Sequence, residues 1–102
     1  MIHVLATIEL QPGQRESFLQ EMRVLVPRVQ AEDGCLEYGP AIDLDTPIEA
    51  QPPVRENVVM VVEKWASLEA LQAHLDAPHM HAFRERVASM VARLELHILE
   101  PA

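Results

Sequence analysis

The segment from Asn57 to Trp65 constrains the fold of this chain more than any other part of its sequence. It reads Asn-Val-Val-Met-Val-Val-Glu-Lys-Trp, so its middle is apolar at every position. A run of this kind favours a strand, and a strand that is apolar on both faces is covered on both sides. Because the helices of one small domain cover only one side of a four-stranded sheet, we expect a second copy of the chain on the other side.

Three other segments alternate between apolar and polar residues with the period of a strand. Residues 2–10 form the first of them, residues 35–44 the second, and residues 94–98 the last. Pro40 cannot donate a ladder hydrogen bond, so it indicates that the second strand lies at a sheet edge or contains a bulge.

Helical periodicity appears first in residues 14–32, where apolar residues recur on one face. Pro27 removes one backbone hydrogen bond, so we expect a kink or break near Arg23–Val26. The pair Asp33-Gly34 then stops the helix.

Two helices follow the Asn57–Trp65 strand. Ser67 is a good N-cap for a short helix over about 68–76. Pro78 stops that helix and can begin the next one, which we expect over about 79–92.

The predicted order is β, α, β, loop, β, α, α, β, with a long loop over residues 45–56. This is the order of a split βαβ, or ferredoxin-like, α+β domain, which has an antiparallel four-stranded sheet with helices on one face. We see no internal repeat and expect one domain over residues 1–102.

The amino-acid composition limits the kinds of partner that this chain is expected to bind. Of the 102 residues, 49% are hydrophobic, which is much apolar surface for a small monomer to hide and again favours a homodimer. The net charge of −8 disfavours nucleic-acid binding and anionic membrane surfaces. There is no apolar run long enough to span a membrane, no signal peptide, and one cysteine, Cys35, so we expect a cytoplasmic protein.

Three of the five histidines, His74, His79 and His81, cluster around the break at Ala77-Pro78. Histidine is the usual proton carrier near neutral pH, and the break could bring His74 and His79 toward one pocket. Each could equally be a polar helix residue that faces solvent. Their spacing does not suit a zinc site, and no cysteine pair is present, so we expect no metal.

The Asn57–Trp65 strand also carries polar groups. Glu63 and Trp65 share one face by alternation, and a buried carboxylate at Glu63 would need a partner, which His74 or an arginine could supply. Trp65 and the methionines, Met60 among them, could equally be core residues. Tyr38, the only tyrosine, could orient a ligand through its hydroxyl or cap the core.

Taken together, several stretches resemble the antibiotic biosynthesis monooxygenase superfamily, and within it the small bacterial quinol monooxygenases. The stretches are Gly34-Cys35-Leu36-Glu37-Tyr38, Val61-Val62-Glu63-Lys64-Trp65, Ala70-Leu71-Gln72-Ala73-His74-Leu75, Ala77-Pro78-His79-Met80-His81-Ala82-Phe83 and Leu96-His97-Ile98-Leu99-Glu100-Pro101. The resemblance covers essentially the whole chain, and its most specific part runs from Glu63 to Phe83.

The resemblance implies a ferredoxin-like protomer, a dimeric α/β barrel, and a pocket between sheet and helices in each protomer. It implies an enzyme that oxidises a small quinol or phenolic aromatic with O2 as co-substrate and with no cofactor. A base deprotonates the substrate, the anion passes an electron to O2, and the radical pair collapses to a peroxide that breaks down to product.

The resemblance also suggests roles for individual residues. His74 is then the base, Glu63 orients it, and His79 is a second donor. Trp65 and Met60 form walls of the substrate site, and Tyr38 lies beside it.

Some positions depart from the superfamily's patterns. Polyketide-tailoring members carry an Asn where this chain has Val61, and the residues of haem-degrading members are replaced here by Thr7, His74 and Arg84. Haem degradation is therefore disfavoured. An isomerase of a small carbonyl compound, or a small-molecule-binding stress module without turnover, stays open as an alternative on the same scaffold.

Overall fold

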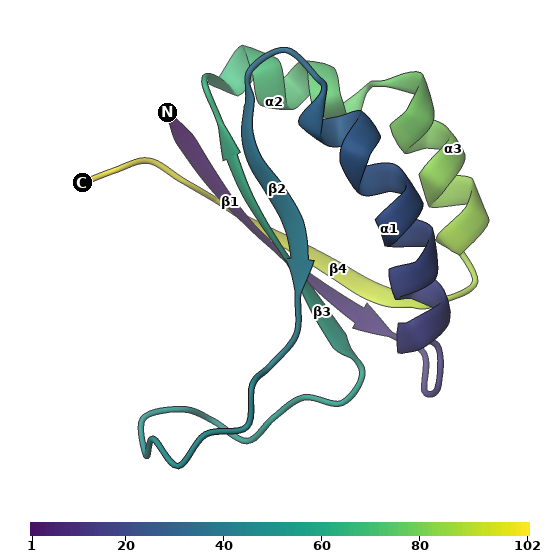
Figure 1. Cartoon of the computed structure of the whole chain (residues 1–102), viewed down its shortest axis with the longest axis vertical. Helices are drawn as coiled ribbons and strands as arrows, with labels where there is room; N and C mark the ends of the chain where they lie inside the picture. The colour runs from purple at the N-terminus through teal and green to yellow at the C-terminus, as the bar shows by residue number, and fades with distance from the viewer.

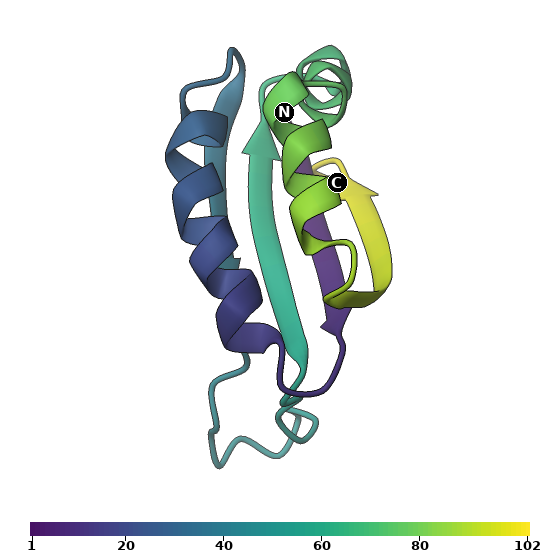
Figure 2. The same ribbon diagram turned by 90° about the vertical axis from the view of Figure 1, so that its right-hand side faces the viewer.

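A computed structural model describes all of residues 1–102 and contains one four-stranded antiparallel sheet and three helices (Figure 1). The elements in chain order are β1 (Ile2–Leu10), α1 (Arg15–Gln30), β2 (Cys35–Ala41), β3 (Val58–Trp65), α2 (Leu68–Leu75), α3 (Pro78–Val87) and β4 (Val91–Leu99). The strands lie in the order β2-β3-β1-β4, and α1 and α3 cover one face of the sheet (Figure 2). The ferredoxin-like prediction is confirmed.

The core lies between the helices and the covered face of the sheet. Alternate residues of β1 are buried there, and α1 contributes the four residues that its periodicity predicts: Phe18, Met22, Leu25 and Val29. From α3, Phe83 packs edge-on against Phe18, with ring centroids 5.8 Å apart. These contacts fix α1 and α3 side by side over the sheet.

The long helix α1 continues through Pro27, so the chain does not break there, and a kink near Arg23–Val26 stays a prediction. Pro27 is exposed on the outer side of the helix, where a missing amide hydrogen bond costs least to the core. Burial of Leu25 and Val29 on either side of it holds the last two turns in place.

The boundary between α3 and β4 also differs from the prediction. The helix ends at Val87, and the strand begins already at Val91 instead of at Leu94. The amides of Met90 and Gln11 explain this, since Met90 N–H bonds Val87 O at 2.8 Å and Gln11 N–H bonds Met90 O at 2.8 Å. Pairing with β1 therefore outweighs the helical spacing of the apolar residues.

The second strand, β2, is an edge strand, as Pro40 indicates. It ends at Ala41, earlier than predicted, and its irregularity lies between Cys35 and Glu37 rather than at Pro40. Because of this bulge, Leu36 is exposed while Tyr38 is buried against the helices, so the two do not share a face as alternation alone would suggest.

The chain between β2 and β3 projects away from the sheet (Figure 1). Its base is closed by Arg55, which donates from its backbone amide and its guanidinium to the Asp43 carboxylate at 2.8 Å in each case. Side chains at Leu44 and Ile48 in this loop are largely exposed.

Candidate active site

A turn at the end of α1 places a carboxylate beside the two short helices. Gly34 has φ +81°, and a Cβ on it would lie 2.6 Å from the Cβ of Ala70 in α2. Glycine therefore allows the turn to pack directly on α2. The backbone of Glu32, in the same turn, is held by hydrogen bonds to Val29 and from Cys35. Its side chain then points toward the junction of α2 and α3.

At this junction one oxygen of Glu32 contacts two histidines. His74 Nδ1, in the last turn of α2, lies 2.9 Å from Glu32 Oε2, and His79 Nε2, in the first turn of α3, lies 2.7 Å from the same atom. The side chain of Glu32 is only 15% exposed. The break at Pro78 thus brings His74 and His79 together, as the sequence suggests, but through a carboxylate 42 and 47 residues away.

The ring of His74 is buried between two aromatic rings. The centroid of Trp65 lies 4.6 Å away and that of Tyr38 5.5 Å away. Burial lowers the pKa of His74, although the hydrogen bond and charge of Glu32 act in the opposite direction. The imidazole is therefore neutral at neutral pH.

The Glu63 side chain is paired with Trp65, whose Nε1–H donates to Glu63 Oε1 at 2.8 Å. The expectation that Glu63 orients His74 is wrong, because Glu32 occupies His74 Nδ1. Burial raises the pKa of Glu63 to about 7; the Trp65 hydrogen bond opposes this shift and the charge of Glu32 adds to it. Near neutral pH this carboxyl is about half protonated and can donate or accept a proton.

These groups meet in a cavity of about 270 Å³ between the sheet and the helices. Most of its lining is apolar, and its polar side chains are Tyr38, Glu63, His74 and Arg84. His74 Nε2 has no hydrogen-bond partner and is not sealed from solvent, so it opens into this space. An apolar cavity with a few converging polar groups is the usual form of a small-molecule site.

The structure separates the other predicted residues. Trp65 is fully buried behind Glu63 and His74 and does not line the cavity. Met60 lies on the opposite face of the sheet, where Thr7 Oγ1–H donates to its sulfur at 3.4 Å, so the expectation that Met60 forms a cavity wall is wrong. Tyr38 lines the cavity, and burial raises its pKa, which keeps its hydroxyl protonated.

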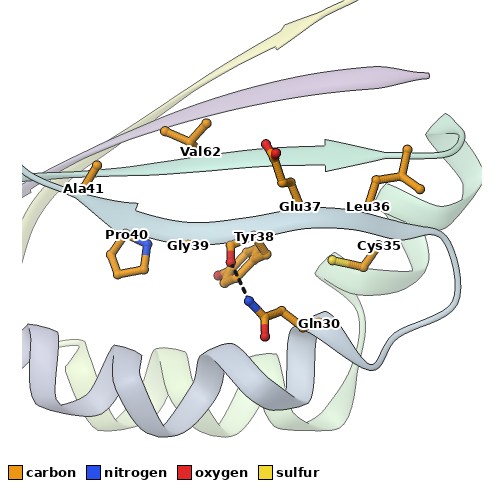
Figure 3. Close-up of a pocket in the computed structure, with 9 residues that line it drawn as sticks. All are labelled: Gln30, Cys35, Leu36, Glu37, Tyr38, Gly39, Pro40, Ala41 and Val62. Atoms are coloured by element: carbon orange, nitrogen blue, oxygen red, sulfur yellow. Dashed lines mark hydrogen bonds between the residues drawn. The ribbon is translucent and has the colours of Figure 1, made fainter.

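Two other hollows flank this cavity. A groove of about 460 Å³ follows the free edge of β2, and Figure 3 shows its lining residues on both sides of that strand. Gln30 Nε2–H donates to the Tyr38 carbonyl at 3.2 Å across it. A second groove, of about 310 Å³, lies between α1 and α3, and His79, Arg28 and Arg86 are among its lining residues.

Sequence reasoning missed two residues of the site. Glu32 is an acidic residue just before a predicted helix stop, and nothing in its local pattern separates it from Asp33. Arg84 is exposed on α3, yet it reaches the cavity rim and donates to the Leu75 carbonyl.

No three His, Cys, Asp or Glu side chains converge in a way that could hold a metal ion. None of the three helices combines the length and apolar character that a bilayer crossing requires.

The comparisons of this chain with known proteins agree with one another. A model of the family described as "Antibiotic biosynthesis monooxygenase" matches residues 1–86. "Probable quinol monooxygenase YgiN" of Escherichia coli K12 is 37% identical over 99% of this chain and 98% of its own length. The crystal structure of PA3566 from Pseudomonas aeruginosa has a TM-score of 0.81 at 25% identity, covering 99% of this chain and 93% of that one. A conserved protein from Methanosarcina mazei Go1 has a TM-score of 0.82 at 20% identity, covering 99% and 92%.

Proposed function

The chain belongs to the antibiotic biosynthesis monooxygenase family, and from this premise we propose that it oxidises a small quinol or phenolic aromatic with O2 and without a cofactor. The name of the E. coli relative supports the quinol class. The observation that carries the proposal is the neutral imidazole of His74, held at Nδ1 by Glu32 and open at Nε2 to an apolar cavity.

His74 acts as the general base. An ionised carboxylate offers only acceptor lone pairs, so His74 donates Nδ1–H to Glu32 and keeps the lone pair on Nε2. This lone pair takes the proton of a substrate hydroxyl. A positioned base of this kind contributes roughly 10²–10⁴-fold to a rate.

The resulting anion is electron-rich enough to reduce O2 by one electron. The radical pair then combines to a peroxide, and cleavage of its O–O bond leaves one oxygen atom in the product and releases the other as water. The substrate supplies all the electrons, so no external reductant is needed. Protons leave the substrate early and return to oxygen late, and His74 serves both steps.

Two further side chains face the developing negative oxygen. Glu63, with its pKa raised to about 7, and Tyr38, whose hydroxyl stays protonated, both line the cavity as potential donors. Trp65 fixes the Glu63 carboxyl and packs on His74, which makes it a positioning residue. His79 reaches the reaction only through Glu32.

The working unit is a homodimer. Leu94 and Leu96 of β4 line the cavity, yet they are 57% and 37% exposed in one chain. A second copy that packs on the uncovered face of the sheet and extends past the edge strand β4 would also cover Leu94 and Leu96 and so close the cavity. The cytoplasmic location stays a prediction.

Oxygen uptake by the purified, metal-free protein tests the proposal. The substrates are reduced naphthoquinones, benzoquinols and anthrones, each measured against its own autoxidation rate. We expect uptake that falls by about 10²-fold or more in His74→Ala and is unchanged in His81→Ala, an exposed histidine paired with Asp76. Absence of uptake with every substrate would refute the proposal and favour an isomerase or a binding module, and full activity in His74→Ala would refute the role of this residue.

A further inference from the structure

Two residues that line separate hollows of this molecule contact one carboxylate oxygen. His74 lines the inner cavity, and His79 lines the groove between α1 and α3 on the outside. Both rings contact Glu32 Oε2, at 2.9 Å and 2.7 Å, so an unbroken chain of titratable groups leads from the cavity to the groove. We propose that His74, Glu32 and His79 form a proton relay that connects the reaction cavity to solvent through the outer groove.

The exposure of the three groups increases along the chain. The His74 side chain is 2% exposed, that of Glu32 15%, and that of His79 21%. His79 Nδ1 has no partner within the protein and is open to solvent in the groove. The inner end is therefore shielded from water more than the outer end.

The surroundings of His74 make such an exit necessary. The titratable and charged groups that face it are Glu32 from the turn after α1, His79 and Arg84 from α3, and Tyr38 and Glu63 from the sheet. Burial, His79 and Arg84 all disfavour an imidazolium at this position, and Glu32 alone favours it. A proton taken from the substrate is thus held poorly on His74 and is better moved outward.

The transfer balances without any other reactant. A substrate proton adds to His74 Nε2 while the Nδ1 proton passes to Glu32 Oε2, which leaves a neutral imidazole and a neutral carboxyl. At rest His79, like His74, donates a ring N–H to Glu32, here from Nε2. Once Glu32 is neutral, His79 moves this proton to Nδ1 by exchange with solvent, accepts the Glu32 proton at Nε2 and releases the Nδ1 proton to water. The same steps in reverse return a proton to the oxygen that becomes water, so each group ends as it began.

This inference rests on the proposed role of His74 as the base, but the connection itself can be tested without turnover. In protein labelled with ¹⁵N-histidine, the exchange of the His74 Nδ1 proton with water is measured by saturation transfer. We expect exchange to slow by about an order of magnitude in Glu32→Gln, which cannot carry the proton, and in His79→Phe, which fills the groove with an inert ring. His81→Phe, two residues further along α3 and outside the chain of groups, should exchange like the unchanged protein.

Equal exchange rates in the unchanged protein and in His79→Phe would overturn the relay. His79 is partly exposed on a helix surface, so this variant decides the matter even if Glu32→Gln fails to fold.

Turnover provides a second readout that a purely structural role for His79 does not predict. With a substrate that supports oxygen uptake, His79→Phe should lower kcat with little change in KM. His79→Ala should also lower kcat, but added imidazole should restore it, because a small base can enter the vacated groove. Equal losses in the two variants at every imidazole concentration would mean that His79 only holds Glu32 in place.

The two proposals fail in different ways. Absence of oxygen uptake with slowed proton exchange in His79→Phe would refute the monooxygenase and leave the relay standing. Normal oxygen uptake with an unaltered exchange rate in His79→Phe would refute the relay and leave the monooxygenase proposal standing.

Discussion

Glu63 couples the site to the stability of the fold. Its side chain is buried, and its pKa is raised from 4.5 to about 7, first of all by that burial. The folded protein thus binds the Glu63 proton more tightly than the unfolded chain does. This contribution to stability is fully present below pH 4.5, decreases as the pH rises, and is lost above about pH 7.

Replacing Glu63 with Gln should therefore remove much of the pH dependence of unfolding. The Gln oxygen can still accept the hydrogen bond from Trp65, and no charge forms in the core. One pKa unit corresponds to about 1.4 kcal/mol. We therefore expect the free energy of unfolding of the variant to exceed that of the unchanged protein by about 3 kcal/mol at pH 8 and to equal it near pH 4.5. Urea unfolding at both pH values measures this, and a pH-independent difference would contradict it.

For individual residues, the sequence predicts which side chains gather in one region more accurately than it predicts which of them form hydrogen bonds with each other. The break at Pro78 and the alternation of β3 correctly indicate that His74, Glu63 and Trp65 gather near one place. The carboxylate that bonds His74 is nevertheless Glu32, which approaches only because the Gly34 turn packs on α2. A contact that depends on the docking of two distant elements leaves no local pattern in the sequence.

Among the elements, the turn at Gly34 should be the least tolerant of a side chain. Gly34→Ala adds a Cβ at 2.6 Å from Ala70 Cβ and strains a backbone with φ +81°. We therefore expect the free energy of unfolding to fall by about 3 kcal/mol. Gly13 provides the matched control, because its φ is +80° but nothing lies within 4 Å of an added Cβ. Gly13→Ala should lose only about 1 kcal/mol, the strain alone. Equal losses in thermal or urea unfolding would show that the approach to Ala70 does not matter.

The unbroken course of α1 predicts that Pro27 weakens this helix. Pro27→Ala restores a backbone N–H four residues after Arg23 and relieves the ring's clash with that turn. Because Pro27 is exposed, no core contact is lost. We expect the free energy of unfolding to rise by about 2 kcal/mol, a value that already allows for the more flexible unfolded chain of the variant. Arg28→Ala, the next residue on the outer side, should change stability by less than about 0.5 kcal/mol. A destabilised Pro27→Ala in urea unfolding would mean that the helix is kinked and depends on proline.

The sequence predicts the boundaries of elements that are set by neighbouring residues. It misses a boundary that is set by strand pairing. Ser67 accepts a hydrogen bond from the Ala70 amide at 3.1 Å, and Pro78 begins α3, both as expected. The start of β4 at Val91 was missed, because apolar residues at positions 87, 90, 91 and 94 fit helical spacing until β1 is present to pair with them.

For the whole molecule, the strand order was predictable and the quaternary arrangement is still a proposal. The chain exposes 6593 Å², whereas a compact monomer of 11.5 kDa exposes roughly 5,800 Å². The exposed surface includes β4, where eight of nine residues are exposed, and the sheet face away from the helices, where Val62 is 40% exposed. An excess of this kind favours association through the sheet.

The row of residues across the middle of that open face identifies a single position to test. Gly39, Val62, Leu5 and His97 are successive neighbours on the four strands, and Val62 is 40% exposed. In a sheet-to-sheet dimer Val62 lies at the centre of the interface, so a charge there loses its hydration without gaining a partner. Val62→Asp should raise the dimer dissociation constant by about a hundredfold or more, equivalent to roughly 3 kcal/mol.

Val24→Asp is the matched control, because Val24 is 68% exposed on α1, on the other side of the molecule from the open face. Light scattering from micromolar to nanomolar protein should give a dimer for the unchanged protein and for Val24→Asp, and a monomer for Val62→Asp. Oxygen uptake by the unchanged protein and by Val62→Asp should fall with the fraction of dimer, since Leu94 and Leu96 leave the cavity open in a single chain. A monomeric unchanged protein with full uptake would refute both the dimer and its role in closing the cavity.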